Sequence, residues 1–152
     1  MRSEIDRAGD ARFLPRFLLL LGELAACLGE ANEIDKGLAV VDGTLERCKA
    51  RHEQWYVPEL LRIKGELMLK DTQHQFALPA EQCFSEALGL AKQQGALFWE
   101  LRNALSLARL RAEQDRKTDA SRILASAYGA FEGLEIADAR EAKTLLNRLG
   151  AE

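Results

Sequence analysis

The amino-acid sequence predicts an all-α protein built from three stacked antiparallel helical hairpins and a final capping helix. Three observations lead to this prediction: the chain repeats itself at an interval of 43 residues, its apolar residues recur every three or four positions, and the alternation typical of strands is absent. Apolar residues at that spacing fall on one face of an α-helix. One helical hairpin cannot bury such a face alone, so neighbouring hairpins stack and share a continuous core.

The internal repeat is clearest in the first helix of each unit. The tripeptide Gly-Glu-Leu at 22–24 recurs at 65–67, and Pro15 recurs as Pro58. A further shift by 43 brings position 65 onto Ala108. We therefore interpret residues 1–152 as a single domain with repeats at about 13–50, 56–93 and 98–131 and a capping helix at about 138–149.

Each expected element has its own start or stop signal. Pro15 and Pro58 stand at the starts of the first two hairpins, where a first helical turn tolerates the missing backbone donor. Polar turns at 29–32, 71–75 and 114–117 divide the two helices of each hairpin. Asp138 caps the last helix, whose apolar face carries Ala142, Leu145, Leu146 and Leu149.

Small residues recur at matching points of these helices. Gly22, Gly65 and Ala108 hold this place in the first helices, and Ala80 and Ala87 do so in a second helix. We expect two helix backbones to approach closely at these points. A larger residue would overpack the contact and destabilise the fold by about 1–3 kcal/mol.

The composition is that of an ordinary globular protein. The 152 residues include 21 basic and 24 acidic side chains, which gives a formal net charge of −3. A chain of this length buries enough surface to fold without a metal or a disulfide. The net charge argues against a general polyanion binder, and the excess of basic residues between 102 and 122 is small. We therefore expect no nucleic-acid partner.

Three cysteines, Cys27, Cys48 and Cys83, are widely spaced and odd in number. This pattern is typical of reduced thiols that pack as small hydrophobes in a cytoplasmic protein, rather than of a secreted disulfide framework. An alternative is that Leu-Ala-Ala-Cys at 24–27 forms a lipoprotein cleavage box. Acidic residues ahead of it and a short apolar stretch disfavour a signal peptide. No segment has the length of a membrane span, so we expect no membrane partner.

The recurring residues resemble tetratricopeptide repeats. In the second repeat the resemblance rests on small residues at Gly65, Ala80 and Ala87 and a bulky one at Phe84. The third repeat carries the same pattern at Ala108, Ala120, Leu124 and Ala127. The first two repeats have three extra residues at the hairpin compared with that family. The resemblance implies a right-handed solenoid with a concave groove lined by the first helix of each repeat.

Two segments also resemble the C-terminal helical region of large bacterial regulators, and the likeness covers about 13–149. Trp55 and Tyr56 run into one such segment at 61–67, and Trp99 runs into the other at 104–110. Those regulators join a nucleotide-binding ATPase core to a cyclase or a DNA-binding domain. The resemblance implies a scaffold or sensor part of a signalling or transcription regulator. No phosphate-binding Gly-x-x-x-x-Gly-Lys-Ser/Thr loop is present, so it implies no ATPase activity.

The resemblance to tetratricopeptide repeats implies that the concave groove is lined by residues next to the small position of each first helix. We expect a protein or peptide partner there, in a non-catalytic interaction. The candidates Arg62, Arg102 and Arg109 would anchor an acidic or carboxyl-bearing segment. The alternative is that all of these are ordinary surface charges. The full set of candidates is Arg16, Leu19, Glu23, Glu59, Arg62, Glu66, Arg102, Leu105 and Arg109.

A small enzyme or metal-binding protein is the alternative from another class. Cys48 and His52 are four residues apart, and His74 and Cys83 could complete a set of four zinc ligands. The paired spacings of zinc sites are absent, however. The glutamates of the two Gly-Glu-Leu tripeptides could form a carboxylate pair, but the third repeat has Arg109 in their place, and nothing requires a desolvated carboxylate. We expect no catalysis, metal or cofactor.

Self-association is the alternative within the binding class. An open end of the stack, marked by Phe13, Phe17 and Leu20 of the first helix, could pair with another copy. Aromatic residues that open the second and third repeats recur at matching points, which favours packing between repeats over a partner surface. These aromatic residues are Trp55, Tyr56, Phe98 and Trp99.

Overall fold

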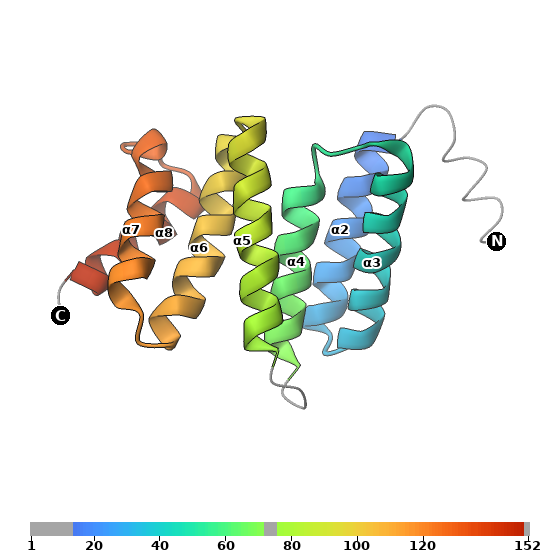
Figure 1. Ribbon diagram of the computed structural model, residues 1–152, viewed down its shortest axis with the longest axis horizontal. Coiled ribbons are helices and arrows are strands. Elements are labelled where there is room, and N and C mark those ends of the chain that lie inside the picture. Colours follow the sequence, from blue (N-terminus) through green and yellow to red (C-terminus); the bar gives the residue numbers. More distant parts are fainter. Residues whose placement is uncertain (1–13, 72–75, 151–152) are drawn as a thin grey trace.

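The computed structural model describes residues 14–71 and 76–150 of the chain, and these residues form α-helices without any strand (Figure 1). This confirms the all-α prediction. A short 3-10 helix, η1, follows the helix labelled α7. The seven α-helices of the described residues are α2 (Leu14–Glu30), α3 (Ile34–Arg51), α4 (Val57–Lys70), α5 (Ala77–Gln94), α6 (Leu97–Glu113), α7 (Lys117–Tyr128) and α8 (Ala137–Gly150), and η1 spans Gly129–Phe131.

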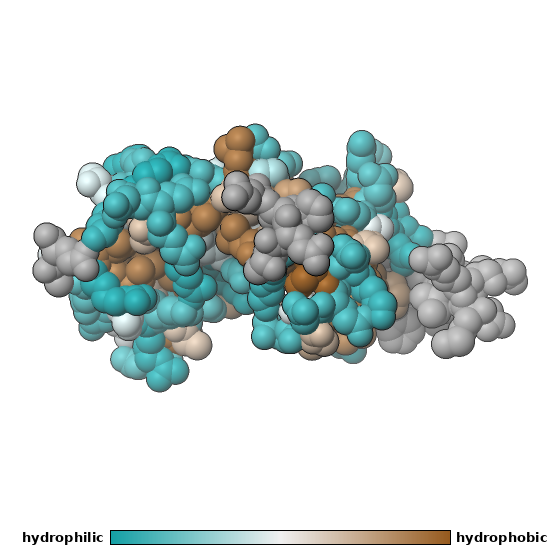
Figure 2. Space-filling model, turned by 90° about the horizontal axis from the view of Figure 1, so that it is seen from below, coloured by the Kyte–Doolittle hydropathy of each residue, from teal (hydrophilic) through white to brown (hydrophobic). Residues whose placement is uncertain are grey.

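Consecutive helices pack against each other along the whole row, from α2 with α3 to α7 with α8. Alternate helices also touch, because α4 contacts both α2 and α6, and α6 contacts α8. In Figure 1 the helices stand side by side, with α2 and α3 at one end of the row and α7 and α8 toward the other. Seen from below, the surface is mainly hydrophilic, with apolar side chains visible in bands between the polar ones (Figure 2).

Two helix ends differ slightly from the prediction. Helix α8 begins at Ala137, so Asp138, predicted as its cap, lies inside the first turn. Helix α2 runs to Glu30, two residues into the turn predicted at 29–32. The turn predicted at 71–75 lies mostly outside the described residues. The turn after α6 contains Asp115 with a φ of 63°, a left-handed conformation that ends the helix without glycine.

The buried apolar side chains form two clusters that meet between α4 and α5. The first unites α2, α3 and α4 around Leu18, Val41 and Leu60. The second unites α5 to α8 around Phe84 and Leu124. Each cluster draws side chains from at least three helices, as expected for helical hairpins that share a core.

The small residues at 22 and 65 have a different reason from the one predicted. A Cβ atom built at Gly22 would lie 2.5 Å from the Tyr56 hydroxyl, and one at Gly65 would lie 2.5 Å from the Phe84 ring. These glycines therefore make room for an aromatic side chain and not for a second backbone. Close backbone approach occurs instead at Gly37, where the Cβ would lie 3.1 Å from the carbonyl oxygen of Ala25.

The cysteines only partly follow the prediction. Cys48 is buried in the first cluster, and burial, followed by the charge of Glu53, raises the pKa of its thiol. Cys83 is half-buried and its thiol pKa is also raised, chiefly by burial. Cys27 is exposed, so the prediction of a core thiol is wrong there, because Cys27 falls on the same side of α2 as the exposed Leu20 and Leu24. None of the described helices is both long and apolar enough to cross a membrane.

Candidate functional site

A buried carboxylate organises the charged residues of α4. Glu59 lies in the first turn of the helix and is only 2% exposed. One turn later, Arg62 donates from Nε to Oε2 of Glu59 at 2.9 Å and from Nη2 to Oε1 at 2.8 Å. This two-bond geometry is the strongest pairing available to an arginine and a carboxylate. The third donor, Nη1, reaches Oε1 of Glu66 at 2.9 Å.

The cluster extends from α4 to α6 and α8. Arg102 of α6 places Nη1 2.7 Å from Oε1 of Glu59 and Nε 3.8 Å from Oδ1 of Asp138 in α8. Ser106 of α6 donates to Glu66 at 2.7 Å. We call this set the α4–α6–α8 charge cluster, and it contains Glu59, Arg62, Glu66, Arg102, Ser106 and Asp138.

Burial and pairing act in opposite directions on Arg62. Burial alone would lower the pKa of its guanidinium, but the hydrogen bonds and charges of Glu59 and Glu66 outweigh that effect and raise the pKa above its ordinary value. Arg62 therefore keeps its charge. Its side chain is only 13% exposed, so most of its donors are directed at carboxylates of the same chain.

The predicted groove residues separate into three groups. Arg16, Leu19 and Glu23 of α2 are exposed. Glu59 and Leu105 are buried, so the prediction that they face a partner is wrong: Glu59 is held by two arginines, and Leu105 belongs to the second apolar cluster. The remaining four keep partial exposure but already pair within the chain, namely Arg62, Glu66, Arg102 and Arg109.

Arg109 shows why the predicted anchors are not simply open to a ligand. Its guanidinium pairs with Glu141 of α8, and Arg102 approaches Asp138 of the same helix. The capping helix therefore presents two carboxylates to the arginines of α6. Sequence analysis missed this arrangement, although Asp138 and Glu141 stand three residues apart, which places them on one side of a helix.

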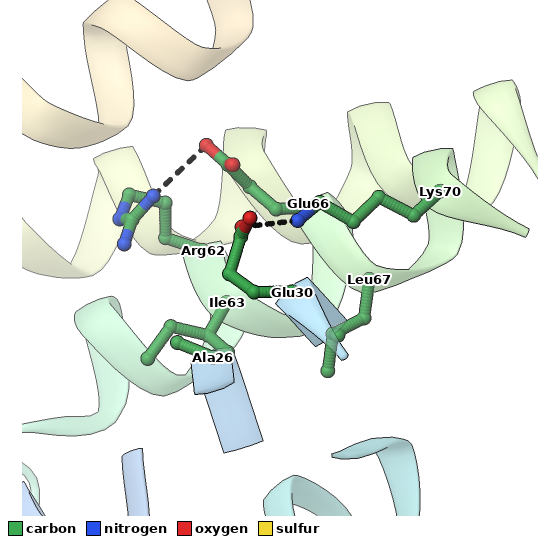
Figure 3. Close-up of a pocket in the computed structure, with 7 residues that line it drawn as sticks. All are labelled: Ala26, Glu30, Arg62, Ile63, Glu66, Leu67 and Lys70. Carbon is green, nitrogen blue, oxygen red and sulfur yellow. Dashed lines mark hydrogen bonds and ion pairs between the residues drawn. The ribbon is translucent and has the colours of Figure 1, made fainter. Parts of the chain in front are cut away.

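A small pocket of about 50 Å³ opens between α2 and α4 (Figure 3). Its apolar wall consists of Ala26, Ile63 and Leu67. Charged residues of both signs surround that wall: Arg62 pairs with Glu66 along α4, and Lys70 at the end of α4 pairs with Glu30 of α2. We call this the α2–α4 pocket, and its lining residues are Ala26, Glu30, Arg62, Ile63, Glu66, Leu67 and Lys70.

Two of the four aromatic residues, Tyr56 and Trp99, pack as predicted, whereas Trp55 and Phe98 are exposed. Tyr56 is buried, and its ring centroid lies 5.6 Å from that of the half-buried Trp99. Burial, followed by the charges of Glu59 and Glu23, raises the pKa of the Tyr56 hydroxyl to about 12. Phe98 is exposed, and the Arg102 guanidinium lies 5.7 Å from the centre of its ring.

The candidate zinc ligands lie on different elements. Cys48 is buried in α3, whereas His52 is exposed at the end of that helix and Cys83 lies on α5. His74 lies outside the described residues. Among residues 14–71 and 76–150, no three His, Cys, Asp or Glu side chains come together as metal ligands would.

Comparison with known proteins adds no relative: no family model, curated protein or solved structure matches this chain. The class that the fold defines is therefore an all-α protein of consecutively packed helices.

Proposed function

We propose that the protein is a non-catalytic interaction module that binds a peptide or a partner domain along the surface of α2, α4 and α6. The observation that supports this proposal is the α2–α4 pocket, which combines an apolar wall with charges of both signs. Recognition sites for side chains typically pair an apolar surface with a few placed polar groups. The pocket is small, so it suits one aliphatic side chain of a larger partner.

The proposed architecture is a right-handed tetratricopeptide-like solenoid. Contacts between the alternate helices α2, α4, α6 and α8 support it, because a stack of hairpins brings the first helix of each repeat beside the first helix of the next. In such a stack these helices line the concave side. The α2–α4 pocket and the exposed residues Arg16, Leu19 and Glu23 then share one groove.

The partner that fits this groove is a protein segment carrying an aliphatic residue flanked by charges. Lys70 and Glu30 on the rim offer one charge of each sign. We further propose, from the resemblance of the Trp55 and Trp99 segments, that the module serves as a scaffold or sensor part of a cytoplasmic bacterial signalling or transcription regulator.

The test is selection of peptides from a random display library on the full chain, followed by affinity measurements on variants. Ala26→Leu fills the pocket and should weaken the selected peptides by at least about 10-fold, since it removes the space for one buried side chain. Ala26→Ser, which is close to alanine in size, should leave the affinity within about 2-fold.

A charge exchange tests the rim of the pocket. Combining Glu30→Lys with Lys70→Glu preserves the ion pair but reverses the charge pattern that a partner meets. Exchanging the Lys92 and Glu100 pair in the same way is the matched control at another place. Selected peptides that bind all of these variants as tightly as the original chain would show that the partner site lies elsewhere.

A further inference from the structure

Helix α2 carries an apolar stripe whose central leucines are exposed. Leu20 is 65% exposed and Leu24 is 47% exposed, with Phe17 half-buried and Cys27 exposed on the same side. These four residues are spaced by three, four and three positions, which is the a and d spacing of a coiled-coil helix. We call Phe17, Leu20, Leu24 and Cys27 the α2 seam.

The internal repeat indicates that such a stripe is a helix-packing surface. A shift by 43 residues places Phe17, Leu20 and Leu24 on Leu60, Ile63 and Leu67 of α4. In α4 these three side chains are buried in the cluster that α4 shares with α2 and α3.

Direct contacts show that this face of α4 receives a neighbouring hairpin. The Leu67 side chain packs against Gly29 of α2 and Gly37 of α3. A Cβ atom built at Gly29 would lie 2.5 Å from Leu67, and one built at Gly37 would lie 3.1 Å from it. On the same helix, Lys64 pairs with Asp42 of α3 at 2.7 Å. The equivalent face of α2 therefore has the residues of a helix-packing surface, but Leu20 and Leu24 stay exposed on it. Phe17 is covered in part by Arg47 of α3, whose guanidinium lies 5.5 Å from the centre of the Phe17 ring.

A hollow beside the seam strengthens this interpretation. A depression of about 240 Å³ lies between α2 and α3. A Cβ atom at Gly43 would have nothing within 4 Å, so the floor of the depression is open. Its lining residues are Leu21, Ala39, Val40, Gly43, Thr44 and Arg47. The end of the molecule thus offers a ridge of leucines next to a hollow, and such a surface is self-complementary when it is paired about a two-fold axis.

The charges beside the seam select the orientation of the pair. Arg16, Glu23 and Glu30 follow one another at seven-residue intervals along one flank of the seam. A parallel pair of α2 helices would place this flank against the opposite flank of the second copy, where Leu21 and Leu28 lie. An antiparallel pair brings the same flank of both copies together, so Arg16 of one copy approaches Glu30 of the other at both ends, while the two exposed Glu23 side chains meet at the centre.

The opposite end of the molecule does not complement the seam. Helix α8 buries Ala139, Ala142 and Leu145 toward the core. Its exposed side chains are mostly polar or basic, including Arg140, Lys143, Asn147 and Arg148, and the exposed acidic residue Glu141 already pairs with Arg109 of α6. Head-to-tail stacking would press basic residues against leucines and Arg16, so the seam pairs with itself rather than with α8.

We infer that the α2 seam is a homodimer interface, in which α2 packs antiparallel against α2 of a second copy and the leucines enter the hollow beside α3. In this arrangement Phe17 lies across from Cys27 of the second copy, and Leu20 lies across from Leu24. The seam is on a different side of α2 from Ala26, and its flank shares only Glu30 with the residues that line the α2–α4 pocket. The tests below therefore change Leu20 and Leu24, which do not line that pocket.

The first test is the mass of the full chain in solution, measured by sedimentation equilibrium from about 1 mM to about 1 μM, the range in which weak and moderate complexes dissociate. The expected result is twice the 17.0 kDa of the chain at high concentration. Leu20→Glu and Leu24→Glu should each raise the dissociation constant by at least about 100-fold, because each places two charges in the interface. Leu78→Glu is the matched control, since Leu78 is 66% exposed on α5, and it should dimerise as the original chain does.

The second test fixes the orientation by disulfide trapping. Phe17→Cys should form a covalent dimer with Cys27 of the second copy under mild oxidation, and adding Cys27→Ser should abolish it. The two positions are about 15 Å apart along one helix, too far for a bond within the chain.

Four results would overturn the inference. A chain that stays monomeric at all concentrations excludes the dimer, and a dimer unaffected by Leu20→Glu and Leu24→Glu places the interface elsewhere. Oxidation of the original chain to a dimer through Cys27 alone, or growth beyond the dimer, would indicate parallel or head-to-tail pairing instead.

Discussion

At the scale of single residues, Glu59 has the greatest influence on the charged surface. It is buried, it receives two hydrogen bonds from Arg62, and it also pairs with Arg102. Its carboxylate thereby fixes two arginines that would otherwise be directed toward solvent or a partner. Arg102 therefore bridges α6 and α4, and Arg62 is held within α4 by Glu59 and Glu66. Only the remaining donors of these two arginines are available to a ligand.

The first prediction concerns this carboxylate. Glu59→Gln removes the negative charge and leaves Arg62 and Arg102 facing an amide in a largely dry site. Loss of one partner from a buried ion pair typically destabilises a protein by about 3–5 kcal/mol. We expect a decrease in this range in the free energy of unfolding, measured by urea denaturation.

An exposed pair provides the control for that measurement. Asp119→Asn removes a partner of the exposed Arg122 and Arg116, and should leave the free energy of unfolding nearly unchanged, because solvent screens exposed ion pairs. Equal effects of the two substitutions would show that burial of Glu59 adds nothing to the pairing.

At the scale of helices, the ends are set by backbone conformation more than by capping side chains. Gly95 ends α5 with a φ of 64°, and His52 ends α3 with a φ of 57°. Both backbone N–H groups return to carbonyl oxygens in the last turn of their helices. Glycine adopts this left-handed conformation without strain, whereas a residue with a Cβ atom does so at a cost.

The second prediction compares the same substitution at two glycines of one helix. Gly95→Ala should lower the free energy of unfolding by about 1 kcal/mol, because alanine is strained at that φ. Gly89→Ala should raise it by up to about 1 kcal/mol, because Gly89 lies inside α5 and its Cβ atom would meet nothing within 4 Å. Thermal unfolding of both variants checks the opposite signs, and a change of the same sign in both would contradict this account.

The sequence was sufficient to predict the helices because apolar spacing and the 43-residue repeat are local and periodic. It was not sufficient for Glu59, whose burial depends on arginines three residues away in α4 and 43 residues away in α6. It also misjudged Gly22, because Tyr56, which fills the space beside it, is far along the chain. The α2–α4 pocket has no periodic signature, since its residues come from two helices that meet only in the folded chain.

At the scale of the whole molecule, the division of the core into two clusters governs how stability is shared. One cluster spans α2 to α4 and the other spans α5 to α8, and they meet where the Phe84 ring approaches Gly65. In a row of helical repeats that mostly contact their neighbours, the free energy of unfolding is approximately the sum of the intrinsic stability of each repeat and the interaction energy between neighbouring repeats. Local unfolding of the helices at one end of the molecule therefore need not unfold those at the other end.

The third prediction follows from this division and is measured by native-state hydrogen exchange, helix by helix. Leu18→Ala creates a cavity in the first cluster, where Leu18 is fully buried, and a change of this kind typically lowers stability by about 2–5 kcal/mol. Amide protection should therefore fall in α2 and α3 and be largely preserved in α6 and α7. Leu124→Ala, at an equally buried residue of the second cluster, should produce the reverse pattern. If both substitutions lower protection equally in all helices, the two clusters unfold as a single cooperative unit, and the contact between Phe84 and Gly65 couples the two ends of the molecule more strongly than the separation of their cores implies.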